Sequence, residues 1–126
     1  MKYPTALLSV VLFLAVVATA TGAAESNAVQ TMATILLHFQ HFPSDADKQS
    51  LKQITEDKSA TKDERTVAKA LMDVQHTAAA ADKPKLEAIV NDAKAASSVK
   101  TLASIILNLK HTPSESDKEK LKALAT

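Results

Sequence analysis

The chain has 126 residues, of which 46% are hydrophobic and 23% charged, with a formal net charge of +1 and no cysteine. The absence of cysteine excludes disulfide bonds, thiolate metal sites and cysteine nucleophiles. The near-zero charge, with Arg65 as the single arginine, argues against a nucleic-acid-binding protein, which requires clustered basic residues.

The first 24 residues have the pattern of a secretory signal peptide. Lys2 is followed by an uncharged apolar run over residues 6–18 and then by small residues. The run is shorter than the roughly 20 apolar residues that span a bilayer. We expect cleavage after Ala20 or Ala24, a periplasmic or secreted protein, and no stable membrane insertion afterwards. A retained N-terminal anchor is the alternative.

Residues 25–126 are predicted to form a single all-helical repeat domain, because one segment recurs with a period of 35 residues. A fixed period of this length is typical of stacked repeats. The positions that are identical in all three copies are Thr31/Thr66/Thr101, Ala33/Ala68/Ala103, His41/His76/His111, Asp47/Asp82/Asp117, Lys48/Lys83/Lys118 and Leu51/Leu86/Leu121.

Each copy is predicted to be a helix-turn-helix unit. In the first copy, apolar residues at helical spacing predict an inner helix over residues 26–41. Pro43 then ends that helix, and Ser44 followed by Asp47 resembles a capping box for a second, more polar outer helix. The second copy has Ala79 in place of the serine, so its outer helix should be capped more weakly.

The remaining elements follow the same scheme. Thr61 and Glu64 form a start signal for the inner helix of the second copy, and Ser114 and Asp117 for the last outer helix. The fold class is therefore all-α, with about six helices stacked as a short α-solenoid or as a compact helical bundle. The period resembles tetratricopeptide-type repeats in outline only, since the aromatic and glycine positions of that pattern are missing, and the chain is assigned to no family.

The recurring histidines are predicted to have a structural role. His41, His76 and His111 fall in the last turn of each predicted inner helix, where histidine can bond the final carbonyl groups. Packed helices are about 10 Å apart, whereas zinc requires nitrogen ligands at about 2 Å. We therefore expect no ion to be shared between the copies. Asp47, Asp82 and Asp117 are likewise assigned structural roles.

The sequence contains few motifs that indicate a catalytic site or a metal site. His38 and His41 lie three residues apart on one helix face and form a speculative metal pair. The His41, Ser44 and Asp47 set could imitate a hydrolase triad, but the cap already explains the serine and no G-x-S-x-G motif is present. We expect no catalytic residue, no enzyme activity and no cofactor.

The leading functional hypothesis is an exported, non-enzymatic protein-interaction module whose partner is another protein. An inhibitor or immunity protein is one version of this hypothesis. The candidate contact residues are those expected to face a groove, namely His38, Gln40, Asp73, Gln75, Asn108 and Lys110. A periplasmic carrier of a small ligand or metal ion and a structural envelope protein are the alternatives. The oligomeric state stays open.

Overall fold

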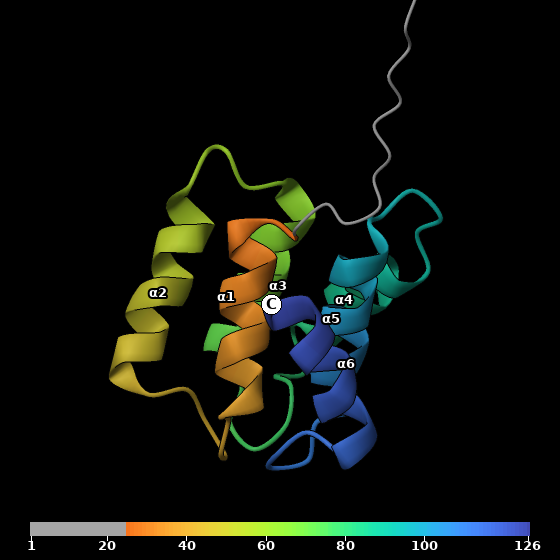
Figure 1. The fold of residues 1–126 in the computed structure, drawn as a ribbon. Helices are drawn as coiled ribbons and strands as arrows, with labels where there is room; N and C mark the ends of the chain where they lie inside the picture. Colours follow the sequence, from red (N-terminus) through yellow and green to blue (C-terminus); the bar gives the residue numbers. More distant parts are fainter. Residues whose placement is uncertain (1–24) are drawn as a thin grey trace, which may run out of the picture.

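The computed structural model describes residues 25–126, so the predicted signal peptide lies outside the described part of the chain. Within this part the fold is all-α, as predicted, and the only β pairing consists of isolated bridges (Figure 1). The helices are α1 (Asn27–Leu37), α2 (Asp45–Glu56), α3 (Lys62–Met72), α4 (Lys83–Val90), α5 (Ser97–Leu107) and α6 (Glu115–Ala125).

The predicted capping residues determine where several helices begin. Ser44 accepts a hydrogen bond from the backbone of Asp47, and the Asp47 side chain accepts one from Ser44 in return, which completes a capping box at α2. Thr61 and Glu64 do the same at α3. By contrast, α4 has no side-chain cap, as expected from the alanine at the equivalent position.

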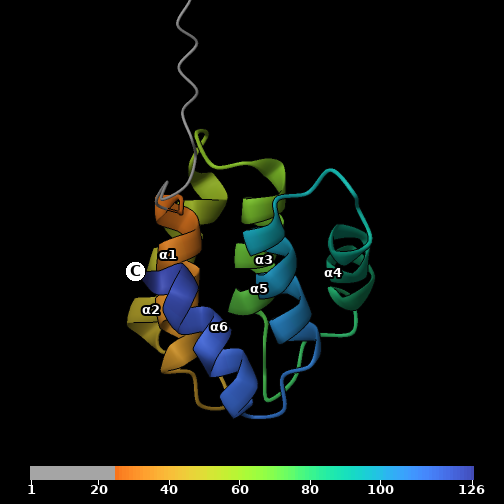
Figure 2. The same ribbon diagram turned by 45° about the vertical axis from the view of Figure 1, so that its right-hand side comes forward.

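The helices form a closed ring around a central axis. The inner helices α1, α3 and α5 contact one another, and Ala33, Ala68 and Ala103 are fully buried, with 0% of their surface exposed. Each outer helix packs most extensively on the next inner helix: α2 on α3, α4 on α5, and α6 back on α1 (Figure 2). The contact between α6 and α1 closes the ring, which makes the domain a compact bundle and not an open array.

The inner helices run in the same direction, so that their carboxyl ends gather at one end of the axis (Figure 2). They end at Leu37, Met72 and Leu107, and the next residues, His38, Asp73 and Asn108, cap them. The predicted extension of the first inner helix to His41 is therefore wrong. A short non-helical segment separates each inner helix from its histidine.

At the opposite end of the axis, the amino ends of two inner helices are joined by a buried carboxylate. Glu64 is only 7% exposed. Its Oε2 accepts a hydrogen bond of 2.7 Å from the Ser26 hydroxyl, which caps α1, and its Oε1 accepts one of 2.9 Å from the Thr61 amide. This carboxylate therefore joins the amino end of α1 to the amino end of α3.

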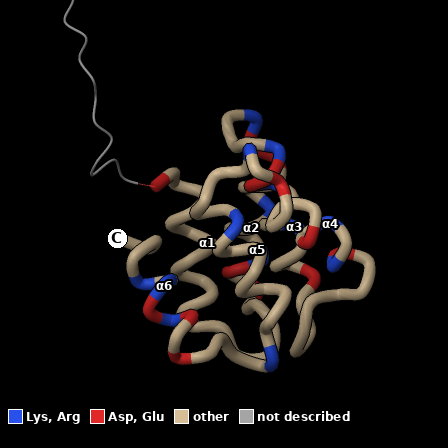
Figure 3. Tube along the Cα trace, turned by 90° about the vertical axis from the view of Figure 1, so that its right-hand side faces the viewer, with Lys and Arg blue, Asp and Glu red and all other residues tan. Residues whose placement is uncertain are grey.

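The surface carries charges of both signs along the helices and loops (Figure 3). Most ion pairs in residues 25–126 are between neighbours on one helix, such as Lys69 with Asp73 at 2.8 Å. Such pairs are typical of solvated helix faces. Among the described helices, none has both the length and the apolar character needed to cross a membrane.

Candidate metal centre

The histidines His41, His76 and His111 each occupy the centre of a tight turn. Their φ angles are 69°, 67° and 68°, in the left-handed region, and they are the only non-glycine residues with positive φ in the described part of the chain. In each turn the amide after the histidine donates to the carbonyl before it, as from Phe42 to Gln40 at 2.7 Å. A γ-turn with φ near about +75° is rare and strained. Residues that bear a β-carbon are disfavoured there by about 1–2 kcal/mol.

A ring of backbone hydrogen bonds ties the three turns together. The His41 amide donates to the His111 carbonyl at 2.8 Å, the His111 amide to the His76 carbonyl at 2.8 Å, and the His76 amide to the His41 carbonyl at 2.5 Å. Each histidine therefore donates to one of the others and accepts from the third. This cycle fixes the three backbones around the axis of the bundle and leaves the side chains to meet at its centre.

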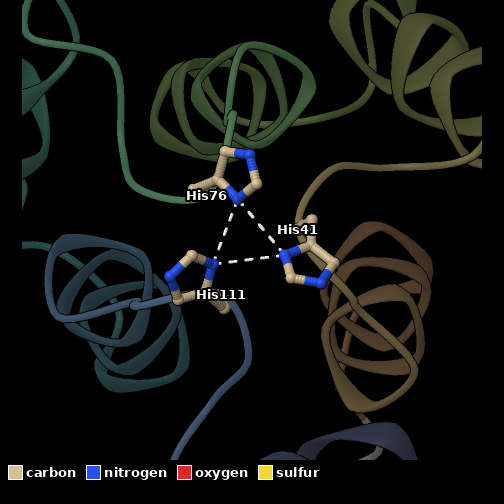
Figure 4. A group of neighbouring side chains, drawn as sticks. All are labelled: His41, His76 and His111. Atoms are coloured by element: carbon tan, nitrogen blue, oxygen red, sulfur yellow. Dashed lines mark hydrogen bonds between the residues drawn. The ribbon is translucent and has the colours of Figure 1, made fainter.

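The imidazole rings point their Nδ1 atoms at one another (Figure 4). The Nδ1–Nδ1 distances are 3.2 Å for His41–His76, 3.2 Å for His41–His111 and 3.0 Å for His76–His111. The ring centroids are farther apart, at 5.0, 5.1 and 4.9 Å, and the ring planes are inclined by 67–73°. Because the nitrogens are much closer together than the rings, the three Nδ1 atoms converge on the axis.

Hydrogen bonding within this group cannot satisfy all three nitrogens. Each neutral imidazole presents either an N–H or a lone pair at Nδ1, so at least two of the three nitrogens present the same kind of group. Two like groups at 3.0–3.2 Å repel each other. A cation on the axis removes this conflict, because it accepts a lone pair from all three nitrogens at once.

The spacing fits a transition-metal ion. The three nitrogens form a nearly equilateral triangle with sides of 3.0–3.2 Å, so each lies about 1.8 Å from its centre. Zinc–nitrogen bonds are about 2.0–2.1 Å long, so the three Nδ1 atoms lie close enough together to bind one zinc ion at the same time. Three protein ligands would leave a fourth position for water or another ligand.

The surroundings favour a cation that exchanges with solvent. All three histidines are exposed, whereas the residues two positions before them, Phe39, Val74 and Leu109, are buried in the core. The site is therefore open on its outer side only. The carboxyl ends of α1, α3 and α5 gather at this end of the bundle, and their partial negative charges favour a cation over an anion.

The structure thus corrects the prediction that the three histidines are too far apart to share an ion. That prediction used the separation of helices in a linear stack. In the closed ring the three chain segments approach the axis, and the positive φ angle turns each imidazole inward. Within residues 25–126, the group that could hold a metal consists of His41, His76 and His111.

The other predicted residues lie around this centre. Of the speculative pair, His41 belongs to the triad, whereas His38 is the exposed C-cap of α1 and is not part of the metal-binding group. Gln40, Gln75 and Lys110 each precede a triad histidine and are exposed. Asp73 and Asn108 cap α3 and α5. These candidate contact residues therefore lie at the end of the bundle that carries the histidine triad, and whether a partner contacts them stays a prediction.

The equivalent aspartates differ between copies. The Asp47 side chain completes the capping box of α2, and the Asp117 amide donates to the Ser114 hydroxyl that caps α6. Asp82, by contrast, is only 5% exposed and its Oδ2 has no hydrogen-bond partner. Burial of this carboxyl, together with a hydrogen bond to Asp73 and the charge of Asp73, raises the pKa of Asp82 above its usual value. Loss of the capping serine thus leaves a destabilising ionisable group in the second copy.

Comparison with protein families, with curated protein sequences and with solved structures found no match to this chain. Its function has to be argued from the site itself.

Proposed function

We propose that this protein binds a divalent transition-metal ion, zinc above all, through His41, His76 and His111, and acts as an exported metal carrier or buffer. The observation that supports this proposal is the convergence of three Nδ1 atoms to within 3.0–3.2 Å of one another. Three imidazoles without a carboxylate or thiolate suit zinc, copper and nickel. Three imidazoles with one open coordination position are a common ligand set for zinc.

The strained turns support a functional role for the histidines. A turn at φ near 68° is most favourable for glycine, yet all three copies place histidine there. Strained backbone that recurs at one point is characteristic of functional sites. A role in ending the inner helices would not need it, because those helices are already capped at residues 38, 73 and 108.

A carrier or buffer fits better than a structural metal site. The apolar core and the ring of backbone hydrogen bonds close the bundle through contacts made by the chain itself. The hydrogen bonds of the triad side chains run between Nδ1 atoms, and the exposed rings carry no described carboxylate bound to Nε2. A carboxylate that accepts a hydrogen bond from the other nitrogen of a metal-bound imidazole usually strengthens metal affinity by about 10–100-fold. Moderate affinity and ready exchange are therefore expected.

Calorimetric titration with zinc, copper and nickel tests the proposal. The expected result is one zinc per chain with a dissociation constant of about 1 µM or below, weakened about 100-fold or more when His76 or His111 is replaced by alanine. His38→Ala is the matched control, since it removes a neighbouring exposed histidine outside the triad, and it should leave the affinity unchanged. No binding tighter than micromolar, or equal losses in His38→Ala and His76→Ala, would overturn the proposal.

Export and partner binding enter this proposal as predictions from the sequence. The apolar N-terminal segment supports export, and the exposed side chains of His38, Gln40, Gln75, Asn108 and Lys110 would allow a docking protein to receive or deliver the ion at this end. The interaction hypothesis drawn from the sequence assumed a groove along an open helical array, whereas the helices of residues 25–126 form a closed bundle.

A further inference from the structure

A groove adjoins the candidate metal centre between the first and second copies. It has a volume of about 560 Å³ and is lined by Phe42, Lys48, Met72, Asp73, Val74, Gln75 and His76. His76 belongs to both the groove and the triad, so the groove adjoins the candidate metal centre. The volume falls within the range of about 300–1,000 Å³ that is usual for small-molecule sites.

This groove differs from its two counterparts in the ring. Phe42 corresponds to Thr77 and Thr112, and Met72 corresponds to Leu37 and Leu107. Phe42 is 58% exposed and is the one exposed large hydrophobic residue in the described part of the chain. Exposure of an aromatic side chain to water costs free energy. Among the three equivalent positions, the aromatic residue stands at position 42, where it lines this groove. The threefold symmetry of the bundle is therefore broken at this groove, where Phe42 and Met72 add apolar side chains to an otherwise mainly polar lining.

We propose that this groove binds a small organic anion with an aromatic or branched apolar body, whose donor group occupies the open coordination position of the metal. The inference rests on the proposed function, because the metal supplies one of the two attachment points. Phe42 and Met72 supply the apolar wall, and Met72 brings a polarisable sulfur that suits an aromatic body. A flexible, unbranched side chain at this position also lets the wall adapt to its ligand.

The charges in the groove favour an anion. Lys48 and a bound zinc ion are both positive, and the one acidic lining residue, Asp73, is paired with Lys69 at 2.8 Å. Lys48 is also one of the residues that are identical in all three copies. A carboxylate or hydroxamate at the metal is thus attracted from two sides, and its apolar body covers the phenyl ring of Phe42.

The probes are benzohydroxamate and acetohydroxamate, which share a metal-binding group and differ in the aromatic ring. Each is titrated into the zinc-loaded and the metal-free protein and followed by calorimetry and by the NMR signals of the methionine methyl groups. We expect benzohydroxamate to bind the zinc-loaded protein about five- to tenfold more tightly than acetohydroxamate. We also expect a shift of the Met72 methyl signal, with the buried Met32 methyl as an internal reference.

The variant Phe42→Thr introduces the residue that the other two copies carry, and it should fold normally because Phe42 is largely exposed. It should reduce the preference for benzohydroxamate to about one without changing the affinity for zinc or for acetohydroxamate. Equal binding of both probes to the zinc-loaded wild-type protein, or an unchanged preference in Phe42→Thr, overturns this inference and leaves the metal site intact. Failure to bind zinc is detected before any hydroxamate is added, and it overturns the proposed function itself.

Discussion

Replacement of a triad histidine by glycine should stabilise the metal-free protein while it abolishes metal binding. His111 is a suitable position, since its imidazole contacts the other two rings and its amide donates to the His76 carbonyl. Glycine and alanine at this position both remove the imidazole and both keep the amide. The two variants differ in the β-carbon alone, so the comparison isolates the backbone strain.

The magnitude follows from the backbone angle. At φ 68° a residue with a β-carbon is disfavoured by about 1–2 kcal/mol, whereas glycine tolerates the angle but loses about 0.5–1 kcal/mol more backbone entropy on folding. His111→Gly should therefore be more stable than His111→Ala by about 1 kcal/mol, or about 4–8 °C in melting temperature for a domain of this size. It should exceed the metal-free wild-type protein by a similar amount.

Zinc should reverse the order. A ligand at 100 times its dissociation constant stabilises the folded state by about 2.7 kcal/mol, and only the wild-type protein has the complete site. Thermal and urea denaturation with and without zinc measure both effects. As a control, the same pair of substitutions at Asn108, where φ is −94°, should favour alanine. A glycine variant at position 111 that is less stable than the alanine variant would refute the argument from strain.

Three further predictions concern the bundle and the pH dependence of the site. Glu64→Ala should destabilise the protein by about 2–3 kcal/mol in urea denaturation, because it leaves the Thr61 amide and the Ser26 hydroxyl without their charged acceptor. A loss below about 0.5 kcal/mol would show that the carboxylate does not join α1 to α3. Asp82→Asn should raise the melting temperature at neutral pH, because burial raises the pKa of Asp82 in the folded state, so that stability falls as the pH rises from the usual aspartate range through that raised value; an unchanged pH profile of stability would contradict this account. Zinc affinity should fall as the solution is acidified, since protons compete with the metal for the imidazole nitrogens, and a pH-independent affinity in calorimetry would point to ligands other than histidine.

The helices and most of their starting points could be predicted from the sequence, because their causes are local. Ser44 with Asp47 and Thr61 with Glu64 form the expected capping boxes, and the alanine at position 79 leaves α4 without a side-chain cap. Each of these features depends on residues three positions apart, and neighbouring residues determine them wherever the helix lies in the fold.

The histidine triad could not be predicted in the same way, since it depends on closure of the whole ring of helices. The approach of His41, His76 and His111 requires α6 to pack on α1 and requires a φ angle that local preference assigns to glycine. A signal was nevertheless present. The capping position of the inner helices accepts histidine, aspartate and asparagine in turn, whereas the position three residues later is histidine in every copy. A capping role alone would not require this identity.

X-ray absorption spectroscopy of the zinc-loaded protein tests the central claim most directly. The account predicts three imidazole nitrogens at about 2.0–2.1 Å and one further light atom from solvent, with the imidazole signal reduced in His76→Ala and unchanged in His38→Ala. A zinc ion bound by carboxylate oxygens with one imidazole or none, or a spectrum that changes in His38→Ala and not in His76→Ala, would contradict it.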